Sequence, residues 1–284
     1  MFLLSIIKND EQNNLFNVNI IYISYFFLLI FSLIAYATKE HVINYEYKGT
    51  IPDKYKKIVI YSCLIGDYDN VSSFNRQEGY DYILFTDQNI KNTNWTVLPI
   101  PKFVDKMKIS KIKKHRYIKI HPHKFFKNYD LSLYIDANYI ITGDMNEFLE
   151  NTLNKIDHIY ITHLQFGRHL KKTISEAIKN DLDNPLLLKD AMNRYYKLGI
   201  LKKRGIVNAG LIIRKHHEPD VIKLMDAWWE EVRDHSHVDN IAFNYAGYKT
   251  GVRFLYMSYQ FTLYYFDHSK HKKKYTYVNH TLLI

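Results

Sequence analysis

Apolar segments of strand length alternate with helix-forming segments along most of the chain after residue 57. Strands are predicted over Ile58–Leu64, Tyr80–Thr86, Trp95–Ile100, Leu131–Ile135, His158–Thr162 and Ile206–Ile213. Helices are predicted over Lys106–Ile120, Asp144–Leu153, Thr173–Asn180, Asn184–Leu198 and Pro219–Val232. Strands that alternate with helices are typical of folds in which each helix returns the chain across a sheet. The pattern therefore predicts an α/β sandwich with a mainly parallel central sheet.

The chain of 284 residues divides into an N-terminal region and one large domain. Residues 1–19 form a short tail, and residues 20–37 carry no charged side chain and are dominated by Ile, Phe, Leu and Tyr. This run is just long enough to cross a bilayer as a helix, so we expect a single-pass membrane anchor. Residues 38–56 are polar and indicate a stem, and residues 57–284 form the domain.

The flanking charges do not fix the orientation of this anchor, because acidic residues offset the lysines on both sides. We favour a domain on the lumenal or extracytoplasmic side of the membrane, in the endoplasmic reticulum or Golgi if the host is eukaryotic. Ala35-Tyr36-Ala37 also resembles a signal-peptidase site. A cleaved and secreted form is therefore the alternative.

Basic side chains exceed acidic ones by 39 − 29 = +10. Such a charge suits nucleic acid, an anionic membrane surface or a phosphorylated ligand. The basic residues are densest over residues 102–127, but neither a zinc-finger spacing nor an RNA-recognition signature accompanies them. We therefore expect no nucleic-acid partner. The single cysteine, Cys63, lies in an apolar strand and is expected to be a buried thiol.

Polar side chains follow three of the predicted strands. Gly66-Asp67-Tyr68-Asp69 follows the first, Thr86-Asp87 closes the second, and Asp136-Ala137-Asn138 follows the fourth. Ligands of open α/β sheets bind beyond the carboxyl ends of the strands, so these segments are expected to meet at one cleft. Asp136 and Asn138 can share one hard divalent cation, which in turn can hold a diphosphate. The alternative is turn chemistry, since Asp and Asn also favour loops after strands.

Seven ordered blocks of sequence extend this pattern over roughly residues 57–255. They are Ile65–Asp69, Phe85–Asp87, Tyr117–His123, Tyr134–Asn138, the spaced His163, Arg168 and Glu176-Ala177, then Gly205–Gly210 with Ile213–His216, and Trp228–Glu231 with Ser236 and Asp239. In order and spacing these blocks resemble the motifs of the DUF616 family, the TOD1/MUCI70 glycosyltransferase-like domain. One departure is Val238-Asp239-Asn240, where the family has Arg-Asp-Gln.

The resemblance implies a GT-A-like, Rossmann-like α/β/α sandwich, here preceded by the N-terminal hydrophobic helix. It implies transfer of a sugar from a nucleotide-diphosphate sugar to a hydroxyl of a glycan or glycoconjugate. A divalent metal, Mn²⁺ or Mg²⁺, is expected to assist. The partners would then be a nucleotide-sugar donor, a glycan or glycoconjugate acceptor and, through residues 20–37, a membrane.

Metal and donor contacts are expected mainly at the strand ends. Asp136 is the expected first metal ligand, and Asn138 the second, directly or through water. By analogy with GT-A enzymes, His268 or His271 would supply a third ligand. The nucleotide sugar would be contacted by Asp67, Asp69, Thr86, Asp87, Arg116, Lys119, Asp136 and Asn138. In this set the carboxylates accept from ribose and base, and the two cations neutralise the diphosphate.

Acceptor contacts are expected further along the chain. Asp239 is the candidate general base or acceptor-positioning group, because an inverting transferase needs a carboxylate to take the proton of the acceptor hydroxyl. N-capping of a helix is its structural alternative. The other residues expected on the acceptor side are His163, Arg168, Glu176 and Asn208. Trp228 and Trp229 are expected to pack in the core.

Two further functions stay open at the level of sequence. A metal-dependent hydrolase acting on a lipid amide or phosphoester would use the same ligands to activate water. A membrane-tethered binding protein without catalytic activity would fit a degenerate site, in which Asn138 stands where a second acid would strengthen metal binding.

Overall fold

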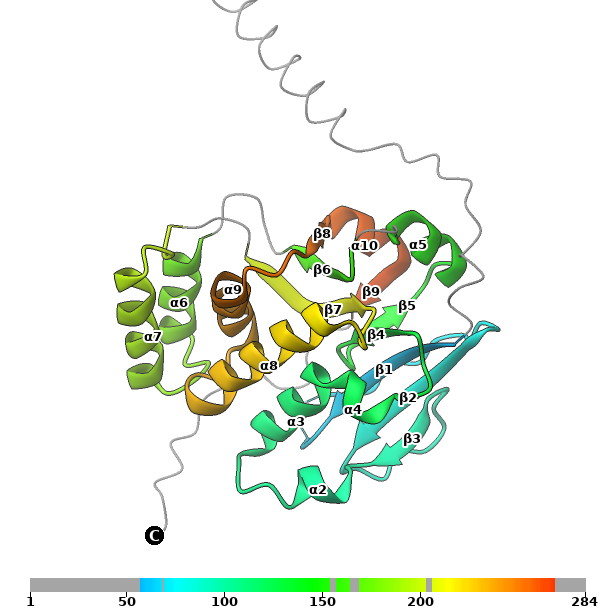
Figure 1. Ribbon diagram of the computed structural model, residues 1–284. Coiled ribbons are helices and arrows are strands. Elements are labelled where there is room, and N and C mark those ends of the chain that lie inside the picture. The colour runs from blue at the N-terminus through cyan, green and yellow to red at the C-terminus, as the bar shows by residue number, and fades with distance from the viewer. Residues whose placement is uncertain (1–56, 68, 154–156, 164–168, 203–205, 269–284) are drawn as a thin grey trace, which may run out of the picture. The chain divides into compact units, whose positions relative to one another are not determined.

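The computed structural model describes residues 57–67, 69–153, 157–163, 169–202 and 206–268 (Figure 1). The tail, the hydrophobic segment and the stem predicted over residues 1–56 lie outside this part of the chain, as do Arg168 and His271. Among the described residues, no helix has the length and apolar character needed to cross a membrane.

A seven-stranded sheet forms the centre of the domain, in the order β3-β2-β1-β4-β7-β6-β8. The strands are β1 (Ile58–Leu64), β2 (Tyr80–Thr86), β3 (Thr96–Pro99), β4 (Leu131–Ile135), β6 (Ile159–His163), β7 (Val207–Arg214) and β8 (Leu255–Met257). Only β7 runs antiparallel to its neighbours, β4 and β6. The remaining pairs, β1 with β2 and β4, β2 with β3, and β6 with β8, are parallel. The predicted mainly parallel sheet is thus confirmed.

The register aligns the carboxyl ends of the central strands. β1 pairs with β2 from Ile58 opposite Tyr80 to Leu64 opposite Thr86, so the two strands end level with each other. β4 joins β1 on the other side. Every residue of β1 and β4 is buried, as expected for strands covered on both faces.

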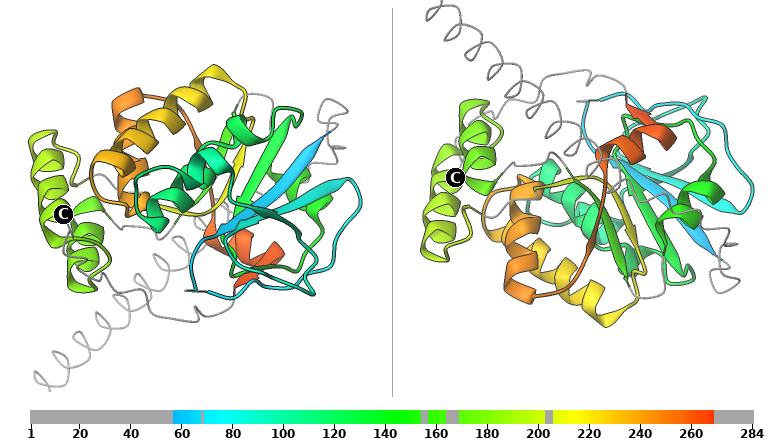
Figure 2. Two further views of the ribbon diagram at one scale, coloured as in Figure 1. Left: turned by 90° about the horizontal axis from the view of Figure 1, so that it is seen from below. Right: turned by 90° about the horizontal axis from the view of Figure 1, so that it is seen from above.

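Helices cover both faces of this sheet (Figures 1 and 2). α3 (Lys111–Ile120), α8 (Pro219–Asp234) and α9 (Asp239–Thr250) lie on one face, and α5 (Met145–Thr152) and α10 (Tyr259–Tyr265) on the other. Two further helices, α6 (Leu170–Lys179) and α7 (Pro185–Lys197), pack against α9 around a core of their own. This arrangement confirms the predicted α/β/α sandwich.

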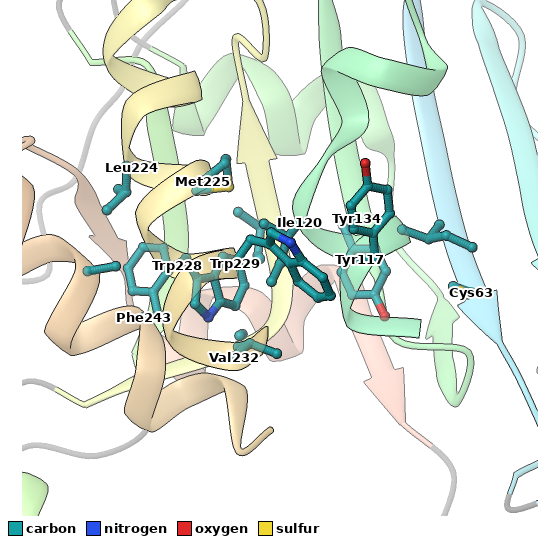
Figure 3. Packing of buried hydrophobic residues seen from close by; sticks show 14 of the residues in the cluster. Cys63, Tyr117, Ile120, Tyr134, Leu224, Met225, Trp228, Trp229, Val232 and Phe243 are labelled. Atoms are coloured by element: carbon teal, nitrogen blue, oxygen red, sulfur yellow. The ribbon is translucent and has the colours of Figure 1, made fainter. Parts of the chain in front are cut away.

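Both tryptophans of α8 are core residues, as predicted (Figure 3). Trp228 is fully buried and packs edge-to-face on Phe243, with ring centroids 5.0 Å apart. Trp229 packs in the same way on Tyr117 of α3, also at 5.0 Å. The first contact joins α8 to α9 and the second joins α8 to α3, which carries two of the predicted donor-binding cations.

Short elements complete the domain. α2 (Lys102–Asp105) and α4 (Pro122–Phe125) flank α3, and β5 (Tyr139–Ile141) pairs antiparallel with β9 (Phe266–His268). The single helix predicted over residues 106–120 is wrong in its first turn: α3 begins at Lys111, because the Ser110 hydroxyl caps it by accepting from Lys113 N. Asp144 and Asn184, the first residues of two predicted helices, are the N-caps of α5 and α7.

Candidate active site

The ends of β1 and β2 are joined by a hydrogen bond. Gly66 N donates to Asp87 Oδ1 at 2.8 Å, and the ammonium of Lys111 lies 2.8 Å from the other oxygen of the same carboxylate. This pairing lowers the pKa of Asp87, since the burial that would raise it is outweighed by the Gly66 and Lys111 contacts. The predicted convergence of strand ends is therefore present at this edge.

The other acids and hydroxyls of these two strand ends have different surroundings. Asp67 is exposed, whereas Asp69 is buried and its Oδ1 accepts from Asn70 N. Thr86 is buried, and its hydroxyl accepts from Gln88 N, which is turn chemistry of the kind that the sequence left open. Asp67 and Asp87 thus present the more accessible carboxylates at this edge.

Asp136 directly follows β4 and is held from two sides. Its backbone N donates to Gly210 O at 2.9 Å, which ties it to the antiparallel strand β7. Its Oδ1 accepts from the Tyr134 hydroxyl at 2.8 Å and lies 3.4 Å from the Lys119 ammonium. The side chain is 35% exposed, so a ligand in the cleft can reach it.

Gly210 allows β7 to approach this carboxylate. A Cβ placed on Gly210 would lie 2.9 Å from Asp136 Oδ2, and 3.1 Å from both Asn208 Oδ1 and a ring carbon of Tyr139. Asn208 Oδ1 accepts from Gly210 N at 2.9 Å. Asn208, predicted on the acceptor side, therefore lies beside the Asp136 carboxylate.

Gly210→Ala is expected to displace Asp136. It should reduce the free energy of nucleoside-diphosphate binding by more than it reduces the free energy of unfolding. Overpacking at such a position costs about 1–3 kcal/mol when neighbours must shift. Isothermal calorimetry with UDP and urea unfolding of the same variant would separate the two effects. Gly247→Ala is the matched control, because its Cβ would lie 2.9 Å from Phe254 rather than from the site. Equal UDP affinity in both variants would contradict the prediction.

A buried lysine connects Asp136 to Asp239. The Lys119 side chain is 1% exposed, and its ammonium lies 2.7 Å from Asp239 Oδ2 and 3.4 Å from Asp136 Oδ1. It also lies 4.8 Å from the centre of the Tyr134 ring, within reach of a cation–π interaction. Arg116 adds a second cation, with its Nε 3.4 Å from Asp239 Oδ2. The two cations predicted at the diphosphate are thus beside the site but paired with an acid.

Asp239 is a poor candidate for a general base in this environment. Burial alone would raise its pKa, but the charges of Arg116 and Lys119 and the hydrogen bond from Lys119 outweigh burial and hold the pKa far below the ordinary value. A carboxylate with so low a pKa takes up a proton weakly near neutral pH. Asp239 does not cap α9 either, because the N-cap of that helix is Val238. Its contacts favour a third role, in which it holds the two cations in place.

His115, a neutral histidine, links Arg116 to Tyr134 within the same network. Burial, followed by the charges of Arg116 and Lys119, lowers the pKa of His115 to about 3. Arg116 lies 3.1 Å from His115 Nδ1, and His115 Nε2 lies 3.3 Å from the Tyr134 hydroxyl. We assign Nδ1 as the acceptor and Nε2 as the donor, because Arg116 can only donate. Hydrogen bonds then run from Arg116 through His115 and Tyr134 to Asp136.

His115, Tyr134 and Gly210 were not predicted as site residues, although the sequence holds a signal for two of them. Tyr134 and Asp136 are two residues apart, so in an extended strand their side chains share one side. His115 and Lys119 are four residues apart and share one face of α3. Nothing local marks Gly210, whose importance depends on the pairing of β7 with β4.

The predicted metal ligands come together in the backbone. Asn138 is buried directly beyond Asp136, and His268 of β9 pairs with Tyr139, the next residue along. The backbone of β9 is therefore adjacent to the acidic turn. The oxygens of a carboxylate and an amide, such as those of Asp136 and Asn138, are ligands that Mn²⁺ and Mg²⁺ take in proteins.

Among the side chains that the structure describes, no three His, Cys, Asp or Glu residues are grouped so that they could hold a metal ion. Asn138 is outside such a group by type, and only the backbone of His268 is described. The metal site therefore stays a prediction that depends on these two residues in addition to Asp136.

The remaining residues predicted on the acceptor side are spread over two elements. His163 ends β6 and pairs with Val207, one residue before Asn208. Glu176 is half-buried on α6, in the helix pair that packs against α9. Of the four predicted acceptor residues, the structure thus places Asn208 directly at Asp136.

Many solved structures are similar to this chain. No protein-family model matches the chain. No curated protein matches it either. The apo structure of the bifunctional glycosyltransferase WbbM aligns with a TM-score of 0.45 and 10% identity, over 74% of this chain and 40% of WbbM. Mouse xyloside xylosyltransferase 1 in its apo form aligns with a TM-score of 0.42 and 9% identity, over 71% of this chain and 85% of the mouse protein. The chain thus spans less than half the length of WbbM.

Proposed function

We propose that this chain is a glycosyltransferase, which moves a sugar from a nucleotide-diphosphate sugar to a hydroxyl of a glycan or glycoconjugate. The observation that carries the proposal is the position of Asp136. It is an accessible carboxylate at the carboxyl edge of a mainly parallel sheet, with two cations of α3 within the same network. Ligands of open α/β sheets bind at this edge. The ordered motif blocks support membership of the DUF616 family.

The donor would lie across the ends of β1, β2 and β4. In this pose the exposed carboxylates of Asp67 and Asp87 accept from ribose and base, and the diphosphate points toward Asp136. Lys111, which pairs with Asp87 and is 68% exposed, adds positive charge near the nucleotide. The phosphates would also lie near Lys119 and Arg116, whose charges favour the departing nucleoside diphosphate.

Asp136, Asn138 and His268 would hold the divalent cation. When bound, Mn²⁺ or Mg²⁺ supplies positive charge that neutralises the leaving diphosphate. Tyr134 and Lys119 contact Oδ1 of Asp136, so Oδ2 is the oxygen left to face a cation. Asp239 pairs with Lys119 and Arg116 and holds them in place, and we assign it a positioning role rather than proton transfer.

Thermal unfolding with UDP, GDP and CDP, each with and without Mn²⁺, tests the proposal. A ligand that binds only the folded chain stabilises it by about 2.7 kcal/mol at a concentration of 100 Kd. We expect one nucleoside diphosphate to raise the melting temperature only with Mn²⁺ present, and the Asp136→Ala variant to lose this shift. Absence of any shift, or cleavage of a lipid amide or phosphoester without a sugar nucleotide, would contradict the proposal.

Attachment to a membrane through residues 20–37 is part of the same proposal. It is supported by the uncharged, apolar character of that segment in the sequence. An acceptor carried on a glycoconjugate at the same membrane surface would then be within reach of the domain.

A further inference from the structure

A small cavity lies beside the candidate active site, between α9, the start of α6 and strand β8. Its volume is about 170 Å³. The described residues that line it are Leu170, Ile200, Asn244, Gly247, Tyr248, Phe254 and Tyr256. None of the predicted donor, metal or acceptor residues whose side chains the structure describes is among them.

Helix α9 leads from the candidate active site to this cavity. Its first residue, Asp239, contacts Lys119, and Asn240, Asn244 and Tyr248 follow at intervals of four residues on one face. At 1.5 Å per residue, Asn244 lies about 7.5 Å and Tyr248 about 13.5 Å along the helix from Asp239. This is the span of a short chain of linked sugar rings. The cavity is therefore placed to hold a remote part of an acceptor.

The lining combines aromatic rings with one amide. Phe254 and Tyr256 meet edge-to-face with ring centroids 5.3 Å apart, and Tyr248 and Tyr256 are 42% and 46% exposed. Asn244 donates through Nδ2 to Asn240 O at 2.7 Å, which leaves its Oδ1 to accept from a ligand hydroxyl. Aromatic faces carry negative potential and attract the C–H face of a sugar ring.

Size and chemical character narrow the class of ligand. Sites for whole drug-sized ligands measure about 300–1,000 Å³, so a cavity of about 170 Å³ admits one ring-sized unit. The described lining residues offer hydroxyl, amide and aromatic groups, which suit the hydroxyls and C–H faces of a sugar. Gly247 lets the Phe254 ring lie against α9, since a Cβ there would come within 2.9 Å of the ring. The cavity thus fits a neutral sugar ring.

We propose that this cavity is an acceptor subsite, which binds one neutral sugar ring of the acceptor glycan a short distance from the point of transfer. The inference rests on the proposed glycosyltransferase function, because that function requires a glycan acceptor. Binding energy from such a remote ring helps to position the hydroxyl that reacts.

Saturation-transfer NMR of the full chain with lactose, maltose, xylobiose and N,N′-diacetylchitobiose tests the subsite without a donor. We expect at least one of these disaccharides to bind at millimolar concentration. Tyr256→Ala should weaken that binding by roughly threefold to tenfold, because it removes an aromatic face. Asn244→Ala is a second variant that removes the amide. Tyr196→Ala is the control, since Tyr196 is 75% exposed on α7 and does not line the cavity.

Binding of UDP with Mn²⁺ in the same variants separates this inference from the proposed function. Tyr256→Ala and Asn244→Ala should leave UDP affinity unchanged. The subsite is overturned if no disaccharide binds, or if Tyr256→Ala and Asn244→Ala bind as tightly as Tyr196→Ala. If disaccharide binding depends on Tyr256 but the chain binds no nucleoside diphosphate, the sugar-binding site is supported and the proposed transferase function is overturned.

Discussion

Asp136→Asn is expected to lower the rate of sugar transfer by about 10²–10³-fold, the usual loss when one preorganised electrostatic group is removed. The amide keeps the shape of the carboxylate and can still accept from the Tyr134 hydroxyl, which now lies 2.8 Å from Oδ1. What disappears is the negative charge that a divalent cation needs. The measurement is kcat/KM for the donor, with UDP affinity in Mn²⁺ as a second readout.

Urea unfolding distinguishes a loss of transfer rate in Asp136→Asn from misfolding of the variant. Asp136→Asn should unfold at nearly the same urea concentration as the parent, because Lys119 keeps its shorter contact of 2.7 Å to Asp239. Asp181→Asn is the matched control: Asp181 is exposed in a turn at φ 49°, a conformation that Asn also tolerates. Transfer at an undiminished rate by Asp136→Asn, in a chain that folds normally, would refute the role assigned to Asp136.

The sequence predicts the buried strands well because their signal is local. The bounds predicted for β1, β2 and β4 match those observed, since each is a short apolar segment between turn residues. Helix α9 was missed for a physical reason. Its apolar residues face two cores, with Phe243 packed toward α8 and Ile241 toward α6 and α7, so no single amphipathic stripe marks it. The direction of β7 was missed because strand pairing is not a local property.

In the candidate site, too, the features with a local signal are predictable from the sequence, and the contacts between distant segments are not. Strand ends that carry Asp87 and Asp136 are visible in the sequence, and their convergence follows from a parallel sheet. The partners of Lys119 are not visible, since Asp239 lies 120 residues away. A lysine on a polar helix is as compatible with solvent as with a buried ion pair until the fold brings α9 onto α3.

Lys119→Met is expected to be the most destabilising substitution at the site, by about 3–5 kcal/mol. Methionine keeps the length and apolar stem of the lysine side chain but removes the ammonium. Lys119 is 1% exposed and Asp239 is 14% exposed, so water cannot replace the lost contact of 2.7 Å. Arg116 at 3.4 Å would be the remaining cation beside Asp239. Urea unfolding at pH 7 measures the loss.

The pH dependence of unfolding should change in the same variant. The folded pKa of Asp239 lies far below its ordinary value, chiefly because Arg116 and Lys119 outweigh the opposing effect of burial. Its contribution to stability is therefore fully present above the unfolded pKa of about 3.9 and is lost as the pH falls below it. Lys119→Met brings the folded pKa of Asp239 closer to the unfolded one. The variant should thus lose less stability than the parent between about pH 6 and pH 3.

A double-mutant cycle with Asp239→Asn decides whether the ion pair itself is responsible. Each single variant removes the contact of 2.7 Å and leaves one of its two charges with a partner at 3.4 Å, Arg116 for Asp239 or Asp136 for Lys119. The double variant removes both charges of the pair, so it should be less destabilised than the sum. The expected coupling is about 0.5–3 kcal/mol. Lys111→Met is the control, because its bridge to Asp87 is 68% exposed on the lysine side and such pairs contribute little. Additive losses in the Lys119–Asp239 cycle would mean that packing, and not charge pairing, holds α9 to α3, and Asp239 would then lose its positioning role.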